Sequence, residues 1–242
     1  MPSRRARAPK SKSPRPRLKG VTACVFDAYG TLFDFAAAAA HFRRRLGART
    51  EPLTEIWRQK QLQYTWLRSL MGRHIDFWQV TQDALDFAFD ALKIKNESLK
   101  AGLLDVYTRL DAFPEVKAVL TKLKAADFQT AILSNGSPMM LRAAAGSAGI
   151  ESLIDEVISV EEVAIYKPHP SVYQLVLSRL SVEPREVVYL SSNGWDAYAA
   201  KAFGFRAVWV NRTRAPAERV PQAPDLVVRS LRDLPPLVGI RA

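Results

Sequence analysis

Five short segments of this chain are rich in β-branched and other apolar residues, and polar residues follow each one. They are VTACVF (21–26), FQTAIL (128–133), DEVISV (155–160), VVYL (187–190) and RAVWV (206–210), with LVV (226–228) as a candidate sixth. Apolar runs of this length are typical of strands buried in a sheet. Helical stretches separate them, and this alternation predicts right-handed βαβ units in a doubly wound parallel sheet, an α/β fold.

Residues 36–112 show a different pattern, because their apolar residues recur at three- and four-residue spacing. Four segments carry this spacing and predict four helices with no strand: AAAAAHFRRRLG, TEIWRQKQLQYTWLRSLMG, DFWQVTQDALDFAFDALKI and ESLKAGLLDVYTRL. Leu53-Thr54-Glu55 is the predicted start of the long helix, and Gly72 follows its end. We expect 36–112 to form a helical cap subdomain, while 20–35 and 113–242 form the core domain.

The positive charge of the chain is concentrated at its start. The sequence has 35 Lys and Arg against 24 Asp and Glu, a net charge of +11. Residues 1–19 contain eight of the basic residues and no acidic one, so the remainder carries only +3. We expect this segment to be a disordered basic tail, and we expect no nucleic-acid partner. Binding of the tail to nucleic acid or anionic lipid is the alternative.

Several classes of protein are excluded by what the sequence lacks. No run of about 18 apolar residues occurs, so we expect no membrane span. Arg4-Arg5 precedes no apolar segment, which argues against export and for a cytoplasmic location. The single cysteine, Cys24, excludes a disulfide framework, and the three histidines lack the spacing of a structural zinc site.

Polar side chains that suit catalysis follow the predicted strands. They are Asp27, Thr31, Ser134, Asn135, Lys167, Ser191, Asn193 and Asp196. The carboxyl ends of parallel strands meet at one edge of a sheet, so we expect these side chains to line one pocket. Asp27 could act as a nucleophile with its charge balanced by Lys167, while Asp196 could activate a water. The alternative is that they are ordinary turn and helix-cap residues.

Four ordered motifs make the chain similar to a known family. Asp27-x-Tyr29-Gly-Thr31, Ser134-Asn135-Gly136, Tyr166-Lys167-Pro168 and Ser191-Ser192-Asn193-Gly-Trp195-Asp196 resemble the motifs of the haloacid dehalogenase superfamily. Residues 56–71, IWRQKQLQYTWLRSLM, resemble the cap helix of its L-2-haloacid dehalogenases, the type II family. The similarity runs from about residue 20 to 234 and implies a Rossmann-like core with an inserted helical cap.

Two of the motifs depart from the pattern of the superfamily's phosphatases. Tyr29 stands where those phosphatases have a second aspartate that serves as general acid. Ser191 and Ser192 stand at the start of the fourth motif, where the phosphatases have an acidic Mg²⁺ ligand. Mg²⁺ requires hard oxygen ligands, usually including carboxylates. We therefore expect no metal and no cofactor. A Mg²⁺-dependent phosphate-ester hydrolase is the alternative enzyme, and a catalytically idle relative that binds nucleic acid through its tail is the alternative from another class.

The resemblance also implies a reaction and a role for each matching residue. Asp27 would attack C2 of an L-2-haloalkanoic acid, and water would hydrolyse the resulting ester to a D-2-hydroxy acid. The residues implied in catalysis are Asp27, Thr31, Arg58, Lys167, Ser191, Asn193 and Asp196. Those implied in substrate binding are Tyr29, Gln59, Leu62, Phe77, Ser134, Asn135, Tyr173 and Trp195. Arg58 would stabilise the departing halide with Asn135, and Ser134 would bind the substrate carboxylate.

Some of these residues have an equally simple structural explanation. Arg58 lies among many charged residues and could be a solvated side chain of its helix. Tyr173, Phe77 and Trp195 would be core aromatics in most folds. The expected partners are a small 2-haloacid, a halide ion and a second copy of the chain. The resemblance implies a homodimer that pairs through the cap. Apolar and aromatic residues there, including Trp57, Trp66, Phe77, Trp78, Phe87 and Phe89, are compatible with such a contact but could equally form the core of the cap.

Overall fold

A single parallel sheet forms the centre of the computed structural model, which describes residues 18–35 and 40–240. Its strand order is β3-β2-β1-β4-β5-β6. The strands are β1 (Ala23–Phe26), β2 (Gln129–Ser134), β3 (Glu156–Ser159), β4 (Val187–Ser191), β5 (Arg206–Val210) and β6 (Leu226–Val228). All neighbouring strands pair in parallel, so the predicted doubly wound α/β fold is confirmed.

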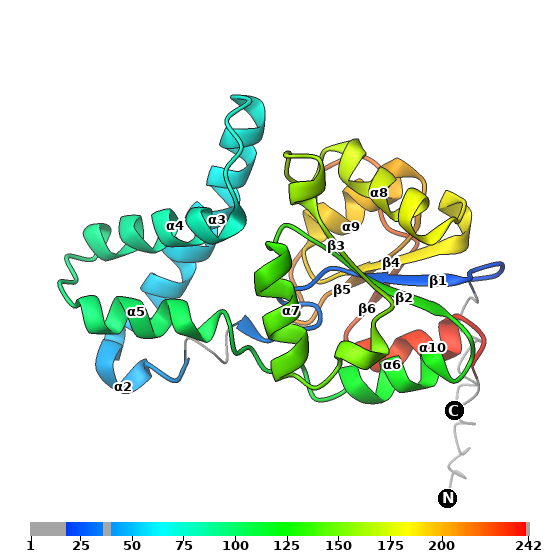
Figure 1. Ribbon diagram of the computed structural model, residues 1–242, viewed down its shortest axis with the longest axis horizontal. Helices are drawn as coiled ribbons and strands as arrows, with labels where there is room; N and C mark the ends of the chain where they lie inside the picture. The colour runs from blue at the N-terminus through cyan, green and yellow to red at the C-terminus, as the bar shows by residue number, and fades with distance from the viewer. Residues whose placement is uncertain (1–17, 36–39, 241–242) are drawn as a thin grey trace, which may run out of the picture.

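Helices pack on both faces of this sheet. They are α6 (Val116–Lys124), α7 (Pro138–Ser147), α8 (Pro170–Leu180), α9 (Gly194–Phe203) and α10 (Leu234–Leu237). Helices α8 and α9 lie on one face, and α6 and α10 lie on the other (Figure 1). Strand β1 pairs with β2 and β4 and is buried along its whole length. The residue that follows β1, Asp27, therefore emerges at the middle of the sheet edge.

Between β1 and β2 the chain forms a separate group of helices, which we call the cap. It contains α2 (Arg43–Leu46), α3 (Thr50–Leu70), α4 (Phe77–Ala91) and α5 (Glu97–Val106). No strand occurs among the described residues of 36–112, as predicted. Residues 36–39, part of the first predicted helix, lie outside the described residues, as do residues 1–17 of the basic tail.

The long helix α3 begins earlier than the sequence predicts. It starts at Thr50, three residues before Leu53, because a short 3-10 turn over Gly47–Arg49 leads directly into it. The hydroxyl of Thr50 donates to the carbonyl of Gly47 at 2.8 Å and supports this entry. The predicted end is correct, since Gly72 follows the helix with a left-handed φ of 62°.

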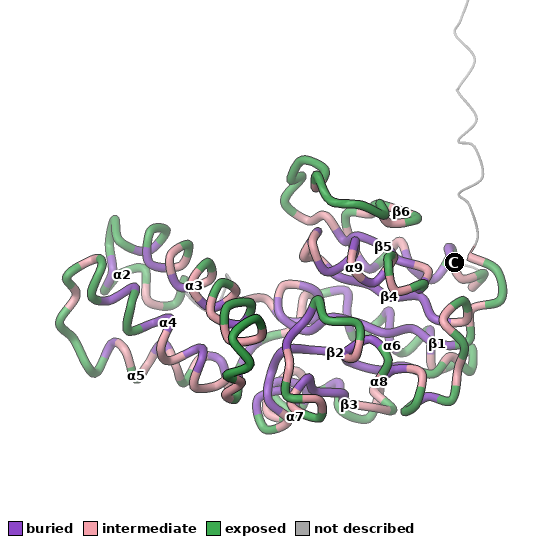
Figure 2. Tube along the Cα trace, turned by 90° about the horizontal axis from the view of Figure 1, so that it is seen from above, coloured by how far each residue is buried: buried purple, intermediate pink, exposed green. Residues whose placement is uncertain are grey.

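The cap stands beside the edge of the sheet at which the strands end (Figures 1 and 2). Two chain segments connect it to the rest of the chain, which we call the core. These segments pair with each other: the amide of Asp34 donates to the carbonyl of Asp111, and that of Phe113 to Leu32, each at 2.9 Å. Figure 2 shows burial concentrated along the strands, with the outer surfaces of the cap exposed. Within the described residues, no helix has the length and apolar character needed to cross a membrane.

Candidate active site

The carboxylate of Asp27 is the centre of the site and is only 6% exposed. Its Oδ2 accepts hydrogen bonds from Asn193 Nδ2 at 2.8 Å, Thr31 Oγ1 at 3.1 Å and Ser191 Oγ at 3.4 Å. Its Oδ1 instead faces the ammonium of Lys167, with Nζ at 3.2 Å. The two oxygens are therefore in different environments, one held by three donors and the other by a single cation.

A tight turn brings Thr31 to this carboxylate. Gly30 adopts a φ of 85°, and a Cβ at this position would lie 2.8 Å from Ser192 Oγ. The backbone amide of Ser192 donates to Thr31 Oγ1 at 2.7 Å. The Thr31 hydroxyl therefore accepts from this amide, and two acceptors for its own proton, Asp27 Oδ2 and Ser192 Oγ, each lie 3.1 Å away.

Lys167 is buried between two carboxylates. Besides Asp27, its Nζ donates to Asp196 Oδ2 at 3.1 Å and to the hydroxyl of Tyr189. Asp196 is fully buried and accepts from Tyr173 at 2.7 Å and from Tyr189 at 2.8 Å. All three ammonium protons of Lys167 thus have an acceptor, which offsets the cost of burying the charge.

Burial controls the acid–base character of these groups. It raises the pKa of Asp196, while the ammonium of Lys167 acts in the opposite direction. Burial also raises the pKa of the Tyr173 and Tyr189 hydroxyls, and the negative charge of Asp196 adds to this effect. Both tyrosines therefore stay protonated at neutral pH and act as hydrogen-bond donors to the carboxylate.

Tyr189 was not predicted as a site residue. It lies inside β4, and the segment VVYL reads simply as a buried strand. The available signal is the tyrosine itself, because a buried tyrosine hydroxyl usually has a hydrogen-bond partner.

The donor set does not fit a Mg²⁺ ion. The ammonium of Lys167 occupies the position between Asp27 and Asp196 that a bridging cation would take. Tyr29 and Ser191 add no carboxylate, and the described part of the chain contains no group of three or more His, Cys, Asp or Glu side chains able to hold a metal.

The second predicted motif lies beside the third. Ser134 Oγ accepts from the amide of Gly136 at 3.1 Å, and Asn135 Oδ1 accepts from the backbone amide of Lys167 at 3.1 Å. This bond fixes the orientation of the Asn135 amide, so its NH₂ group points away from that backbone. Gly136 also permits a close approach, since a Cβ there would lie 2.9 Å from the Tyr29 ring.

The cap contributes one arginine directly to this group. Arg58 Nη2 donates to Asn193 Oδ1 at 3.2 Å, and its Nη1 donates to Gln61 Oε1 at 2.7 Å. Gln61 is fully buried and donates in turn to Thr81 at 2.8 Å. Arg58 is therefore a half-buried side chain whose guanidinium is oriented by two hydrogen bonds. Gln61 was not predicted, although it follows Arg58 by three residues on the same helix face.

A cavity of about 460 Å³ adjoins the site between cap and core. Arg58, Tyr29 and Asn193 line it, together with Gly30, Asp34, Phe35, Phe113, Ser192, Arg212 and Thr213. The ring of Tyr29 stacks on Phe77, with centroids 6.0 Å apart. Burial raises the pKa of the Tyr29 hydroxyl, which has no hydrogen-bond partner in the described structure.

Five of the predicted pocket residues lie outside this hydrogen-bonded group: Tyr29, Phe77, Trp195, Gln59 and Leu62. Trp195 is half-buried and meets Trp66 of the cap edge-on, with ring centroids 5.5 Å apart. Gln59 is exposed and makes no hydrogen bond to the group in the described structure, and the apolar Leu62 is half-buried. Hydrogen bonds and ion pairs therefore join the predicted catalytic residues to one another, whereas they join only some of the predicted substrate-binding residues to this group.

Comparison with known proteins agrees with this arrangement. Residues 21–204 match the model of the haloacid dehalogenase-like hydrolases. The chain is 48% identical over 221 residues to (S)-2-haloacid dehalogenase 1 of Pseudomonas sp. (strain CBS-3), covering 90% of this chain and 96% of the relative.

Solved structures agree as well. One of a dehalogenase superposes with a TM-score of 0.90 at 41% identity, covering 92% of this chain and 99% of that one. The L-2-haloacid dehalogenase from Xanthobacter autotrophicus with chloropropionic acid covalently bound gives a TM-score of 0.83 at 42% identity, covering 91% and 100%. The resemblance seen in the four motifs is confirmed, and the chain belongs to the haloacid dehalogenase-like hydrolase family, among its (S)-2-haloacid dehalogenases.

Proposed function

We propose that the protein hydrolyses L-2-haloalkanoic acids to D-2-hydroxy acids without a metal, through an ester on Asp27. The observation that carries this proposal is the asymmetry of the Asp27 carboxylate, with three donors on Oδ2 and only Lys167 on Oδ1. The covalently bound chloropropionic acid in the related Xanthobacter structure supports a covalent route.

In the first step, Oδ1 of Asp27 attacks C2 of the substrate. A C–O bond forms as the carbon–halogen bond breaks, and the halide leaves with the bonding electron pair. Attack opposite the leaving group inverts C2, and no general acid is required because halide is a stable anion. Arg58, with Asn135, stabilises the departing halide, and Ser134 binds the substrate carboxylate.

In the second step, water adds to Cγ of Asp27 and negative charge develops on Oδ2. Thr31, Ser191 and Asn193 already donate hydrogen bonds to this oxygen, so these preorganised donors stabilise the negative charge as it develops. Asp196 takes a proton from the water, and its raised pKa makes it a better base than an ordinary aspartate.

The intermediate then collapses and the enzyme is restored. The Cγ–Oδ1 bond breaks, and the hydroxy acid leaves with Oδ1 and the proton held by Asp196. Asp27 keeps the oxygen of the water and releases the remaining proton. One water is consumed and one halide, one proton and one hydroxy acid are formed.

Halide release tests the proposal. Wild-type protein and Asp27→Asn are compared on L- and D-2-chloropropionate in the presence of EDTA. We expect chloride from the L-isomer only, with no effect of EDTA and no turnover by the variant. Mg²⁺-dependent hydrolysis of a phosphate ester, without chloride release, would instead support the phosphatase alternative.

We also propose a homodimer that pairs through the cap. Support comes from apolar side chains exposed on α3 and just after it, where Leu70 is 85% and Met71 is 69% exposed. Trp57, Phe77 and Phe89 are buried inside the protein and are not available for such a contact. Light scattering at micromolar concentration tests this proposal, and Leu70→Glu should dissociate the dimer. A monomeric wild type would refute it.

A cytoplasmic location is a further proposal. It is supported by the presence of a single cysteine, Cys24, which leaves the chain without the disulfide framework common in exported proteins. Fractionation of the producing cells, with dehalogenase activity as the readout, tests it. Activity recovered outside the cytoplasmic fraction would contradict it.

A further inference from the structure

Arg212 lies outside all four motifs, two residues beyond the end of β5. Its Nη1 donates to Glu115 Oε1 at 2.7 Å, and its Nη2 donates to the backbone carbonyl of Thr31 at 2.9 Å. The guanidinium also lies 3.7 Å from the centre of the Phe113 ring. One side chain from the end of the sheet therefore contacts three residues that are far away in the sequence.

These three partners border the two segments that connect core and cap. Thr31 directly precedes the first segment, and Phe113 and Glu115 stand at the end of the second. Ser230 Oγ donates to the same Glu115 oxygen at 2.9 Å, which fixes this carboxylate from a third direction. Arg212 thus contacts both connecting segments where they leave the core, through Thr31 beside the first segment and through Phe113 and Glu115 at the end of the second.

Thr31 links this contact to the chemistry. Its carbonyl accepts from Arg212, while its hydroxyl donates to Asp27 Oδ2 at 3.1 Å. A residue held at its backbone in this way presents its hydroxyl in one position. We propose that Arg212 is a positioning residue for the ester-hydrolysis step, acting through Thr31 on Oδ2 of Asp27.

This inference rests on the proposed function and predicts unequal effects on the two steps. During attack on the substrate, Oδ2 loses negative charge as the carboxylate becomes an ester, so a weakened donor does not slow this step. During hydrolysis, Oδ2 becomes an oxyanion and needs every donor. Loss of Arg212 should therefore slow hydrolysis selectively, and the ester should accumulate on Asp27.

The test compares Arg212→Met with wild-type protein on L-2-chloropropionate. We expect kcat to fall by at least about tenfold, by analogy with the loss of an oxyanion donor. We expect KM to change by less than about threefold, because the Arg212 guanidinium is already engaged by Glu115, the Thr31 carbonyl and the Phe113 ring. Intact-protein mass spectrometry of quenched steady-state samples should show a larger ester-bearing fraction than in wild type. Added guanidinium should partly restore kcat in Arg212→Ala.

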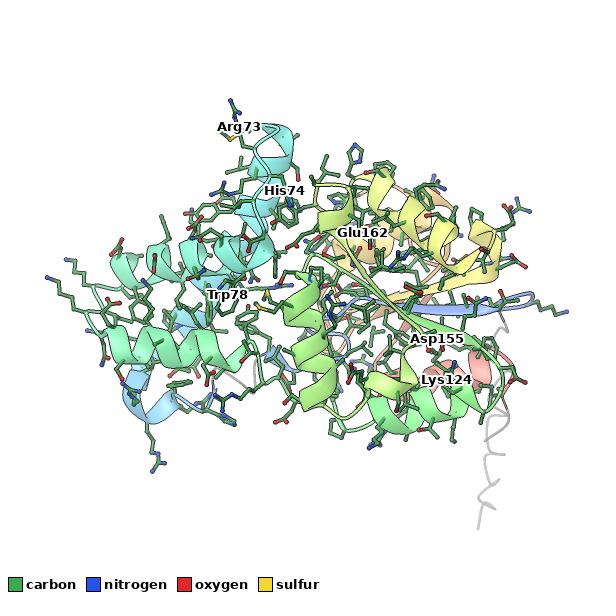
Figure 3. All side chains as sticks on the ribbon, in the orientation of Figure 1. Arg73, His74, Trp78, Lys124, Asp155 and Glu162 are labelled. Atoms are coloured by element: carbon green, nitrogen blue, oxygen red, sulfur yellow. The ribbon has the colours of Figure 1, made fainter. Side chains whose placement is uncertain are left out.

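Lys124→Met is the matched control, since it also replaces a cation with methionine and breaks an ion pair. Lys124 contacts Asp155 at 2.6 Å on the part of the core away from the cap (Figure 3). It should leave kcat, KM and the ester fraction unchanged. Arg212→Lys, which keeps the charge, replaces the methionine variant if the latter fails to fold, and it should show the same ester accumulation.

Three results would overturn the inference. The first is a folded Arg212 variant with wild-type kcat, and the second is a loss of kcat without ester accumulation, as expected of a merely structural role. The third is a wild-type protein that releases no chloride, which refutes the proposed function itself and is recognised before any variant is compared.

Discussion

Arg58 of the cap donates a hydrogen bond to Asn193 of the core across 3.2 Å. The same Asn193 amide donates from its other end to Asp27 Oδ2 at 2.8 Å. A single planar amide therefore connects the arginine that would receive the halide to the carboxylate that would displace it. The position of the cap and the orientation of the nucleophile are coupled through this one side chain.

Replacing Arg58 with lysine keeps the charge but removes the paired geometry of a guanidinium, which reaches Gln61 and Asn193 together. We expect Arg58→Lys to lower kcat/KM for L-2-chloropropionate by about 100-fold, the scale of one lost electrostatic contact to a developing charge. Steady-state chloride release measures this effect. Gln63→Ala, an exposed change on the same helix, is the control. An unchanged kcat/KM in Arg58→Lys would show that the paired geometry is not needed.

The protonation of Asp196 should set the acid side of the pH profile of ester hydrolysis. Burial raises its pKa above the ordinary value of 3.8, so its carboxylate is protonated at a higher pH than that of an exposed aspartate. The rate of ester hydrolysis should therefore fall on the acid side before an ordinary aspartate would titrate. Tyr189→Phe removes a donor to the charged form and should move this fall to higher pH. Tyr198→Phe, which changes a buried tyrosine of α9 that donates no hydrogen bond to Asp196 in the described structure, should not. Single-turnover rates over about pH 4 to 8 measure it, and coincident profiles would contradict it.

Gly136 is closely packed against the site. An added methyl group would lie 2.9 Å from the Tyr29 ring and 3.0 Å from Leu141. Gly136→Ala should therefore destabilise the protein by about 1–3 kcal/mol and raise KM as Tyr29 shifts. The matched change Gly146→Ala, inside α7, meets only Glu151 at 4.0 Å and should stabilise by about 0.5–1 kcal/mol. Thermal unfolding tests both, and equal shifts for the two variants would refute the packing argument.

The Glu115–Arg212 ion pair should make the free energy of unfolding depend on pH. Burial alone would raise the pKa of Glu115, but hydrogen bonds from Arg212, the backbone and Ser230 lower it below the ordinary 4.5. The stabilisation is therefore fully present above pH 4.5 and is lost as pH falls through the lowered pKa.

Glu115→Gln should consequently cost about 1.5–3 kcal/mol at neutral pH, the range of a hydrogen bond to a charged group. Urea unfolding of wild type and variant at neutral pH and below the pKa measures the difference. It should shrink toward zero in acid. A difference that stays constant with pH would show that the charge of Glu115 is not involved.

Much of the fold and of the catalytic group could be predicted from the sequence. Local periodicity distinguishes the strands from the cap helices, and a carboxylate, hydroxyl or lysine directly after a strand lies at the sheet edge whatever the details of packing. For this reason Asp27, Lys167 and Asp196 could be placed in one pocket, and the family resemblance added Arg58, which the structure indeed joins to Asn193.

The tertiary structure decided the contacts that no local pattern encodes. Tyr189 reads as a strand residue, and only the approach of Lys167 and Asp196 gives its hydroxyl a role. Arg212 meets Thr31 across 181 positions of sequence, a contact that exists only once β1 and β5 lie in the same sheet. The sequence by itself determined which chemical groups stand at the ends of the strands, because that depends on neighbouring residues. Which of these groups form hydrogen bonds or ion pairs with one another depends on distances that the packing of the whole chain sets.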